Sequence, residues 1–293
     1  MIMSLGSAGL VGNHHTTIVG LENLVPVPSV VAIGFFDGVH RGHQNIIQRA
    51  MHQSRLKGIR SVVITFDRHP MELTCPERKP ELLMTQARRL NTIAALGPDL
   101  VLVLKFNEEM STQSPEKFVK KVLLDALKTR HVVVGENFHF GFKARGDVDM
   151  LADIGKSAGF TIEGVPLLKE GMITFSSTAI RMAVTAGEVE KAKRILGRPH
   201  LVDVSTINDQ WDSIQKTDGI RLSPHVAIPK TGFYSGRVIF GDMDGKKEDC
   251  LIKVIREPNL QELKLFGFTS KQLENFNDWI RSVALQKRIL VDY

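Results

Sequence analysis

The sequence contains few of the residues that build disulfide frameworks, base-stacking surfaces or membrane spans. Its only cysteines, Cys75 and Cys250, stand far apart, which argues against a disulfide framework or a cysteine-based metal site. Two Trp and two Tyr leave little for stacking on nucleic-acid bases. No apolar stretch approaches the roughly 18 residues of a membrane span, and the first 24 residues lack the basic start of a secretory signal. We therefore expect a cytoplasmic protein with neither nucleic acid nor a membrane as partner.

What is present is an ordinary globular composition with a small excess of positive charge. The chain has 293 residues, of which 43% are hydrophobic and 24% are charged, and this suits one large domain or two of average size. The formal charge of +6 favours phosphate-bearing partners, although a surplus of surface lysine explains it equally well.

Apolar, β-branched segments alternate with amphipathic helical segments over the first half of the chain. Each predicted strand is short and almost continuously apolar, and these strands are residues 29–34, 61–66, 99–106 and 131–136. The helical segments between them start at capping residues such as Thr85 and Ser114. Strands of this kind lie in a parallel sheet that is covered on both faces, so we predict a doubly wound α/β domain.

Ligands of such sheets bind beyond the carboxyl ends of the strands. Three predicted loops follow strands directly and contain glycine, histidine or both: residues 34–43, 65–70 and 135–147. A further polar segment, residues 174–187, places two serines and a threonine at the start of a helix, with Arg181 one turn later. We expect these four segments to converge on one edge of the sheet.

Two histidines stand three residues apart in the first of these loops, whose sequence is GFFDGVHRGHQNII. A strand gives way to a helix here, so His40 and His43 lie on one side of the helix N-terminus, where free N–H groups and the helix dipole attract anions. Imidazoles can donate hydrogen bonds to phosphate there, and Gly42 permits close approach to the backbone. The alternatives are a pair of ordinary surface or core histidines, or a zinc site, for which the sequence offers no third ligand cluster.

The character of the chain changes after the LGRPH segment at residues 196–200. We predict a first domain over residues 1–187, a helical linker over 188–200 and a smaller, mainly β domain over 201–293. Residues 232–240 and 250–255 read as a hairpin around an Asp-Gly turn. The tail has helical spacing and predicts a C-terminal helix with one apolar side, formed by Leu273, Phe276, Trp279, Ile280 and Val283.

Four motifs in order resemble those of the prokaryotic FAD synthetase family, a branch of the nucleotidylyltransferase superfamily with its HxGH signature. The family's adenylyltransferase module has a G-N-F-D-G-V-H-x-G-H loop, a T-F-x-P-H-P loop, a V-G-x-D/E-F/N-x-F-G loop and an S-S-T-x-I-R helix start. The corresponding segments here are residues 34–43, 65–70, 134–141 and 176–181. Phe35 and Arg68 depart from the pattern, standing where the family usually has asparagine and proline.

The resemblance implies an FMN adenylyltransferase, which joins ATP to FMN and gives FAD and pyrophosphate. Magnesium is expected to arrive with ATP, and Asp37 either contributes to it through water or caps the loop. The resemblance assigns catalytic roles to His40, His43, Asn137 and Arg181. It assigns ATP binding to Gly34, Phe35, Asp37, Gly38, Gly42, Ser176, Ser177 and Thr178. It assigns FMN binding to Phe66, Arg68, His69, Pro70 and Phe138. No residue is assigned as a metal ligand.

Many members of this family are bifunctional, with a C-terminal riboflavin kinase module. The kinase's G-x-x-L-G-F/R-P-T-A-N phosphate loop is missing from residues 201–225, whereas residues 228–238 resemble the strand that follows it. We therefore expect a shortened domain that does not phosphorylate riboflavin. The alternatives are a bifunctional enzyme with a divergent kinase domain, a non-catalytic flavin- or nucleotide-binding regulator, and a nucleotidylyltransferase for another phosphorylated acceptor. A monomer or weak homo-oligomer is expected.

Overall fold

The chain folds into two compact units. The computed structural model describes residues 16–204, 220–222, 225–240, 247–257, 260–266 and 280–289. The N-terminal unit comprises the residues up to Pro80 together with Gln86–Gly171, and the C-terminal unit comprises Glu81–Thr85 together with the residues from Met172. The division at Gly171 lies earlier in the chain than the predicted domain boundary after Gly187. The helix of residues 189–196 packs on strands of the C-terminal sheet, and the helix of residues 177–185 packs on that helix.

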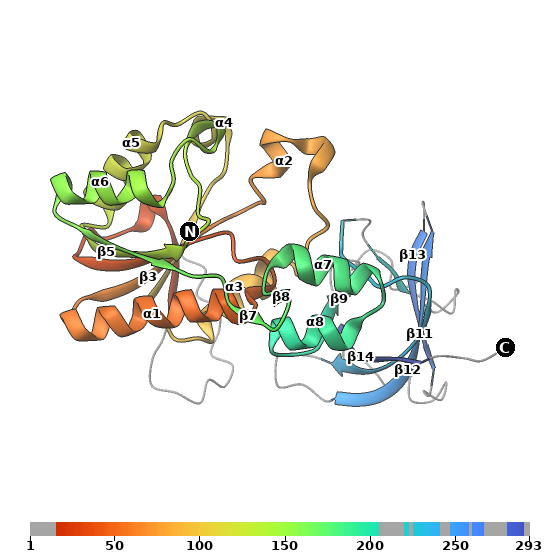
Figure 1. The fold of residues 1–293 in the computed structure, drawn as a ribbon. Helices are drawn as coiled ribbons and strands as arrows, with labels where there is room; N and C mark the ends of the chain where they lie inside the picture. The colour runs from red at the N-terminus through yellow and green to blue at the C-terminus, as the bar shows by residue number, and fades with distance from the viewer. Residues whose placement is uncertain are drawn as a thin grey trace. The chain divides into compact units, whose positions relative to one another are not determined.

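The N-terminal unit is built on a six-stranded parallel sheet (Figure 1). Its strands are β1 (Thr17–Gly20), β2 (Ser29–Ile33), β3 (Arg60–Phe66), β4 (Leu100–Leu104), β5 (Thr129–Gly135) and β6 (Thr161–Val165). They lie in the order β1-β4-β3-β2-β5-β6, and every neighbouring pair is parallel. The chain moves outward from β2 in one direction through β3 and β4, and in the other through β5 and β6. This confirms the predicted doubly wound α/β fold.

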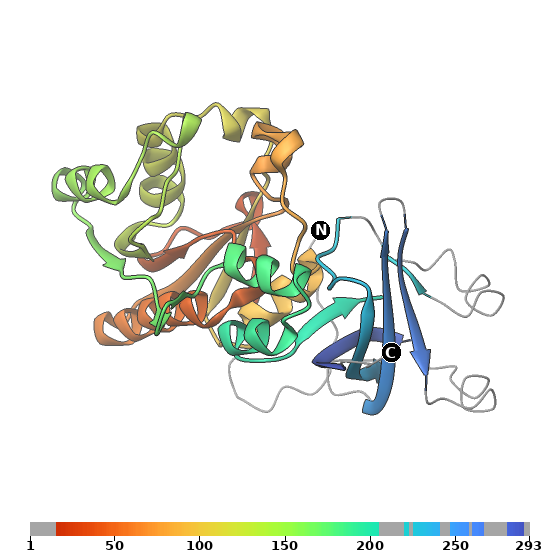
Figure 2. The same ribbon diagram turned by 45° about the vertical axis from the view of Figure 1, so that its right-hand side comes forward.

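Helices cover both faces of this sheet, as the rotated view in Figure 2 also shows. The helices and turns are η1 (Leu21–Asn23), η2 (Asp37–Val39), α1 (Arg41–Lys57), α2 (Met71–Thr74), η3 (Pro76–Arg78), α3 (Gln86–Ala94), α4 (Glu108–Ser111), α5 (Pro115–Phe118), η4 (Val119–Ala126), η5 (Phe142–Ala144) and α6 (Val148–Ala158). Two short strands, β7 (Lys169–Glu170) and β8 (Ile173–Thr174), follow β6.

Alternate residues of each strand face opposite helical layers, because side chains in a strand point to the two faces in turn. Val31 and Ile33 of β2 share one buried core cluster with Leu123 of η4 and Leu151 of α6. The residues between them, such as Ala32, are equally buried, and α1 contacts β2, β3 and β5. Burial on both faces explains the continuous apolar runs that predicted a parallel sheet.

The C-terminal unit is built on an antiparallel sheet with the strand order β10-β13-β12-β11-β14-β9. Its strands are β9 (His200–Asp203), β10 (Ile220–Arg221), β11 (Gly232–Phe240), β12 (Lys247–Glu257), β13 (Leu260–Phe266) and β14 (Ile280–Ile289). Two helices precede the sheet in the chain, α7 (Ser177–Thr185) and α8 (Val189–Leu196). The predicted hairpin of residues 232–240 and 250–255 is confirmed by the pairing of β11 with β12, and its Asp-Gly turn lies outside the described residues.

The predicted C-terminal helix is wrong for Ile280 and Val283, which lie in strand β14. β14 pairs with β11 on one side and with β9 on the other, so pairing on both sides overrides the helical spacing of the sequence. Leu273, Phe276 and Trp279 lie outside the described residues.

Within the part of the chain that the structure describes, no helix combines the length and the apolar character needed to cross a membrane.

Candidate active site

The loop after β2 has an unusual backbone conformation. Phe36, Gly38 and Val39 have φ angles of 59°, 78° and 40°, and only glycine adopts positive values without strain. Phe36 and Val39 are nevertheless almost fully buried. The hydrogen bond from Gln44 Nε2 to the Val39 carbonyl, 2.9 Å long, helps to hold this conformation. Buried strain of this kind is concentrated at functional sites.

The two histidines predicted to bind phosphate lie at the N-terminus of α1. His40 is the N-cap residue, and its Nδ1 atom accepts a hydrogen bond of 3.3 Å from the backbone N–H of His43. An accepting Nδ1 has no proton, so the neutral ring of His40 has its proton on Nε2. The imidazole rings are stacked, with centroids 3.5 Å apart and planes 23° apart. His40 is 4% exposed, and His43 is partly exposed.

This helix end suits an anion. The first turn of α1 contains no acidic residue, so the positive end of the helix dipole is not neutralised within the helix. Gly42 stands in this turn and is partly exposed. The ring of Phe36 meets that of His43 edge to face, with centroids 5.2 Å apart, which fixes the position of the second imidazole from the loop side.

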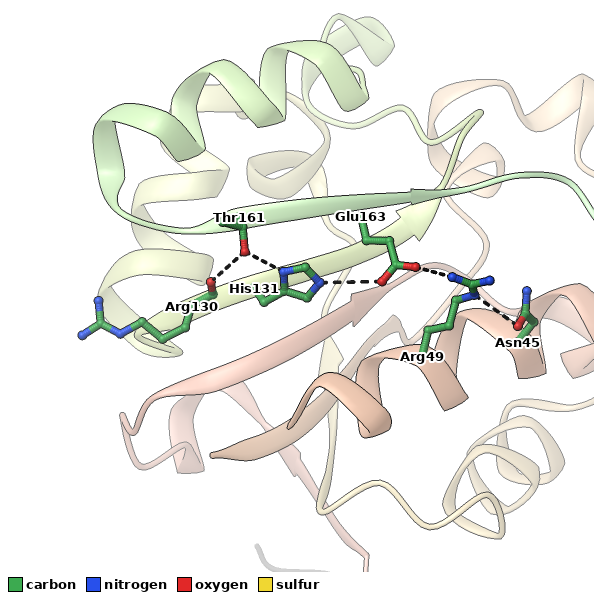
Figure 3. A network of polar contacts seen from close by, with 6 residues as sticks. All are labelled: Asn45, Arg49, Arg130, His131, Thr161 and Glu163. Carbon is green, nitrogen blue, oxygen red and sulfur yellow. Dashed lines mark hydrogen bonds and ion pairs between the residues drawn. The ribbon is translucent and has the colours of Figure 1, made fainter. Parts of the chain in front are cut away.

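A polar network fastens α1 to the sheet (Figure 3). Arg49 of α1 is hydrogen-bonded to Glu163 of β6 and to Asn45, one turn earlier in the helix. Glu163 lies 3.8 Å from Nε2 of His131, whose Nδ1 is 2.7 Å from the hydroxyl of Thr161. Burial, together with nearby Lys57, lowers the pKa of His131, and Glu163 opposes this shift. The network ties the helix that begins at His40 to β5 and β6.

The loop after β3 contacts the loop after β2. The hydroxyl of Thr65 donates to the carbonyl of Phe35 at 3.0 Å, and the rings of Phe35 and His69 meet edge to face at 4.7 Å. His69 Nδ1 accepts from the backbone N–H of Met71 at 3.2 Å, so this ring too is held by its own helix start. Two of the loops predicted to bind substrate therefore lie side by side at the carboxyl edge of the sheet.

The other residues predicted to bind FMN, apart from Phe138, lie at the end of β3 or in the loop that follows it. Pro70 is the N-cap residue of α2, and Phe66 ends β3 and packs edge to face on Phe106. Arg68 is exposed and lies 3.8 Å from the carboxylate of Asp67.

Arg89 contacts Phe35 and Phe66, one residue from each of these two segments, and the sequence analysis did not identify it. Its guanidinium is 3.8 Å from the centre of the Phe35 ring and donates a hydrogen bond to the carbonyl of Phe66. Arg89 is 3% exposed, and burial lowers its pKa to about 10, with Asp37 and Asp67 among the carboxylates that oppose the shift. The group therefore stays cationic at neutral pH. Arg89 precedes Ile93 by one helical turn and shares the buried side of α3, and this spacing is the sequence signal that could have identified it.

The loop after β5 supplies Asn137 and Phe138. Asn137 is exposed, and a Cβ atom on Gly135 would lie 3.1 Å from its Oδ1 atom. The N–H of Phe138 donates to the carbonyl of Gly135 at 3.0 Å, which closes a turn around Asn137. The ring of Phe138 stacks on that of Phe140, with centroids 5.5 Å apart. β5 lies next to β2, so this turn ends the strand beside the one that leads to His40.

The serine-rich helix start belongs to the C-terminal unit. Ser176 is the N-cap residue of α7, and its hydroxyl accepts from the N–H of Ala179 at 3.1 Å. Ser177 and Thr178 form the first turn. Arg181 is partly buried, and its Nε atom donates to the carbonyl of Glu81 at 2.7 Å. That these residues meet the same triphosphate as the histidines stays a prediction.

Among the described residues there is no group of three or more His, Cys, Asp or Glu side chains that could hold a metal ion. Asp37 is 3% exposed and lies in the strained loop before His40. Cys75 and Cys250 are both free thiols. Burial raises the pKa of Cys250 to about 11, so its thiol is protonated at neutral pH.

Comparison with known proteins places the chain in a family. Residues 23–179 match the sequence model of the family described as FAD synthetase. The chain belongs to the FAD synthetase family. The matched residues include all four loops and helix starts described above, apart from the last two residues of the serine-rich motif. The family recognised from sequence is therefore confirmed.

Relatives named bifunctional riboflavin kinase/FMN adenylyltransferase match most of the chain. The protein from Pseudomonas fluorescens is 36% identical over 232 residues, which is 78% of this chain and 73% of the relative. The protein from Escherichia coli K12 is 30% identical over 203 residues, which is 68% of this chain and 64% of the relative. The protein from Bacillus subtilis is 32% identical over 257 residues, which is 83% of this chain and 79% of the relative.

A solved structure shares the fold. The structure titled "Crystal Structure of Macrolide-efflux Protein from Streptococcus pneumoniae" aligns with a TM-score of 0.72, covering 94% of this chain and 92% of the other. Its sequence is 19% identical, a level at which the likeness concerns the fold alone.

Proposed function

We propose that this chain is an FMN adenylyltransferase, which transfers AMP from ATP to FMN and yields FAD and pyrophosphate. The observation that carries the proposal is the stacked pair of His40 and His43 at the N-terminus of α1, in a chain of the FAD synthetase family. The relatives whose names contain FMN adenylyltransferase support the same activity.

The reaction forms a bond between a phosphate oxygen of FMN and the α-phosphorus of ATP and breaks the bond from that phosphorus to pyrophosphate. Negative charge grows on the phosphate oxygens as this happens, so the main requirements are alignment and charge stabilisation. The Nε2–H of His40 and the imidazole of His43 donate hydrogen bonds to those oxygens. The helix N-terminus adds its own N–H groups, with Gly42 in its first turn, and Gly34, Phe35, Asp37 and Gly38 form the loop before it.

The other residues with predicted roles form two groups, one that binds the triphosphate of ATP and one that binds FMN. Ser176, Ser177, Thr178 and Arg181 bind the triphosphate, with Arg181 holding the departing pyrophosphate through two oxygens at once. Phe66, Arg68, His69, Pro70 and Phe138 bind FMN, and Asn137 lies close to its phosphate. The ring contact between Phe35 and His69 supports this arrangement, because it joins an ATP-side residue to an FMN-side residue.

Magnesium enters with ATP in this proposal, bound by phosphate oxygens and water. The carboxylate of Asp37 offers the hard oxygen donor that magnesium prefers, and it would reach the ion through water. Bound there, the ion would neutralise phosphate charge. His40 and His43 orient the same phosphates from the helix end.

We also propose that the transferase domain extends to residue 187, with a linker over 188–200 and a kinase-like domain from 201. The family match supports this by continuing to residue 179, beyond Gly171. The C-terminal domain is proposed not to phosphorylate riboflavin. A cytoplasmic location and a monomeric or weakly associating state are part of the same proposal.

The decisive experiment incubates the purified chain with FMN, ATP and magnesium chloride and separates the flavins by liquid chromatography. FAD and pyrophosphate should appear in equal amounts, and chelation of magnesium should stop the reaction. Flavin or nucleotide binding without FAD would favour a regulator, and adenylylation of another phosphorylated acceptor would favour a different transferase.

A further inference from the structure

A short segment from the middle of the N-terminal half belongs to the C-terminal unit. Residues 81–85 follow the FMN-side loop and its short helices in sequence, yet they group with the residues from Met172. The N–H of Leu82 donates to the carbonyl of His225 at 2.8 Å, and the N–H of Ala227 donates to the carbonyl of Leu82 at 2.9 Å. Thr85 bonds the carboxylate of Asp203 through its hydroxyl at 2.8 Å and its N–H at 3.2 Å.

Glu81, the first residue of this segment, connects two arginines of the C-terminal unit. Its backbone carbonyl accepts from Nε of Arg181 at 2.7 Å. Its carboxylate pairs with the guanidinium of Arg256 at 2.6 Å, and Arg256 also donates to the carbonyl of Ile228. The side chains of Arg256 and Glu81 are 23% and 28% exposed, so water screens this pair less than it screens a surface pair.

The helix that carries Arg181, α7, packs against α8, and α8 packs against β14 and β9 of the same sheet. Val189, at the start of α8, is fully buried in one cluster with Tyr234 of β11. A Cβ atom on Gly187, between α7 and α8, would lie 2.7 Å from the hydroxyl oxygen of Tyr234. Tyr234 of β11 thus contacts the α7–α8 helix pair, and Arg256 of β12 holds Glu81, so both are attached to the antiparallel sheet.

We infer that the C-terminal unit positions Arg181 for adenylyl transfer, with Arg256 and Glu81 as positioning residues. The inference rests on the proposed function, in which Arg181 binds the pyrophosphate part of ATP. A guanidinium is planar, so a hydrogen bond at Nε limits the directions of its terminal nitrogens before substrate arrives. Arg256 holds Glu81 in place, and Glu81 holds Arg181. The C-terminal domain would then be retained without kinase activity because adenylyl transfer depends on the position that this domain gives to Arg181.

The test compares Arg256→Ala with Arg256→Lys, Glu81→Gln and the matched control Arg237→Ala. Arg237 pairs with Asp249 in the same sheet at 2.7 Å, so its removal deletes a more exposed arginine–carboxylate pair away from Glu81. We expect Arg256→Ala to lower kcat/KM for ATP about 10-fold, with KM for FMN unchanged. Arg256→Lys should recover part of the loss, Glu81→Gln should show a smaller loss, and the control should match the wild type.

A double variant separates positioning from a general loss of structure. If Arg256 acts through Arg181, Arg256→Ala should lower kcat/KM little further in an Arg181→Ala background. If the double variant instead lost kcat/KM by the product of the two single losses, the inference would be overturned. Equal losses of kcat/KM in Arg237→Ala and Arg256→Ala would also overturn it. If Arg256→Ala does not fold, as judged by circular dichroism, Arg256→Lys and Glu81→Gln replace it in the same cycle.

Failure of the proposed function would be recognised separately, as absence of FAD in the wild-type reaction. Calorimetric binding of ATP then replaces turnover as the readout. Weaker binding in Arg256→Ala than in Arg237→Ala would support the positioning role, and equal binding would overturn it.

Discussion

His40 and His43 stack face to face at the start of α1, with ring centroids 3.5 Å apart, and His40 also caps the helix. One residue thus caps the helix through Nδ1, and in the proposed function the same residue donates to phosphate through Nε2. The two roles can be separated by substitution, because asparagine is a good N-cap residue and has no imidazole.

His40→Asn and His40→Ala should therefore differ in stability and agree in activity. Both variants should lose roughly 100- to 1,000-fold in kcat, because a donor to the reacting phosphates is removed. Only His40→Ala should also lose about 1 kcal/mol of unfolding free energy, since the cap is removed too. FAD formation and urea unfolding measure the two effects. Near wild-type turnover in His40→Asn would contradict the role of the imidazole.

His43→Ala should lower kcat by a similar factor with little change in stability, because His43 contributes its backbone N–H, and not its side chain, to the cap. The measurement is again FAD formation, with urea unfolding as the control. A variant that keeps full activity would remove His43 from the catalytic site.

Arg89→Met should weaken FMN binding about 10-fold, because the hydrogen bond to Phe66 and the contact with Phe35 are both lost where the two loops proposed to bind substrate meet. Arg89→Lys keeps the charge but not the planar group, so it should restore only part of the affinity. FMN fluorescence titration measures the effect. Arg55→Met, which changes an exposed arginine near the end of α1, is the control and should bind FMN normally.

Stability should fall on the acid side because of His131. Its pKa is lowered in the fold by burial, so the unfolded chain takes up a proton at a higher pH than the folded chain does. The loss should begin near the ordinary histidine pKa of about 6.5 and grow as the pH falls toward the lower folded value. Thermal unfolding between pH 7.5 and 5.5 measures it. His131→Asn should flatten this dependence, and an unchanged slope in that variant would contradict the role of His131.

Gly236→Ala should destabilise the C-terminal unit by about 3 kcal/mol. A Cβ atom there would lie 2.4 Å from the carbonyl oxygen of Ala284 and 2.2 Å from the side chain of Ile252, at a register shift between β11 and β14. A backbone atom cannot move aside as a flexible side chain can. Urea unfolding should show the shift, and the neighbouring Ser235→Ala should not. An unchanged midpoint in Gly236→Ala would mean that the sheet is looser than described.

Riboflavin supplied with ATP and magnesium should yield no FMN. The reason is the missing phosphate loop in residues 201–225, without which ATP and magnesium lack the usual cradle. Flavin chromatography measures the product, with FMN in place of riboflavin as the positive control. Any FMN formed from riboflavin would favour the bifunctional alternative with a divergent kinase domain.

The sequence by itself determined the doubly wound sheet, the histidine pair at a helix start and the family. These features depend on signals a few residues long: continuous apolar runs for strands that are buried on both faces, and a capping residue with glycine for the helix end. Residues 34–43 contain the whole of the strained loop and its two imidazoles, so neighbours in sequence are also neighbours in space.

Only the tertiary structure decided the role of Arg89, the place of residues 81–85 and the strand at Ile280 and Val283. Arg89 contacts Phe35 and Phe66, which belong to other elements, and Glu81 meets Arg256 across 175 residues. β14 is a strand because β9 and β11 pair with it from both sides. Such contacts join segments far apart in the chain, and their energies outweigh local helical spacing, which by itself contributes only a weak preference.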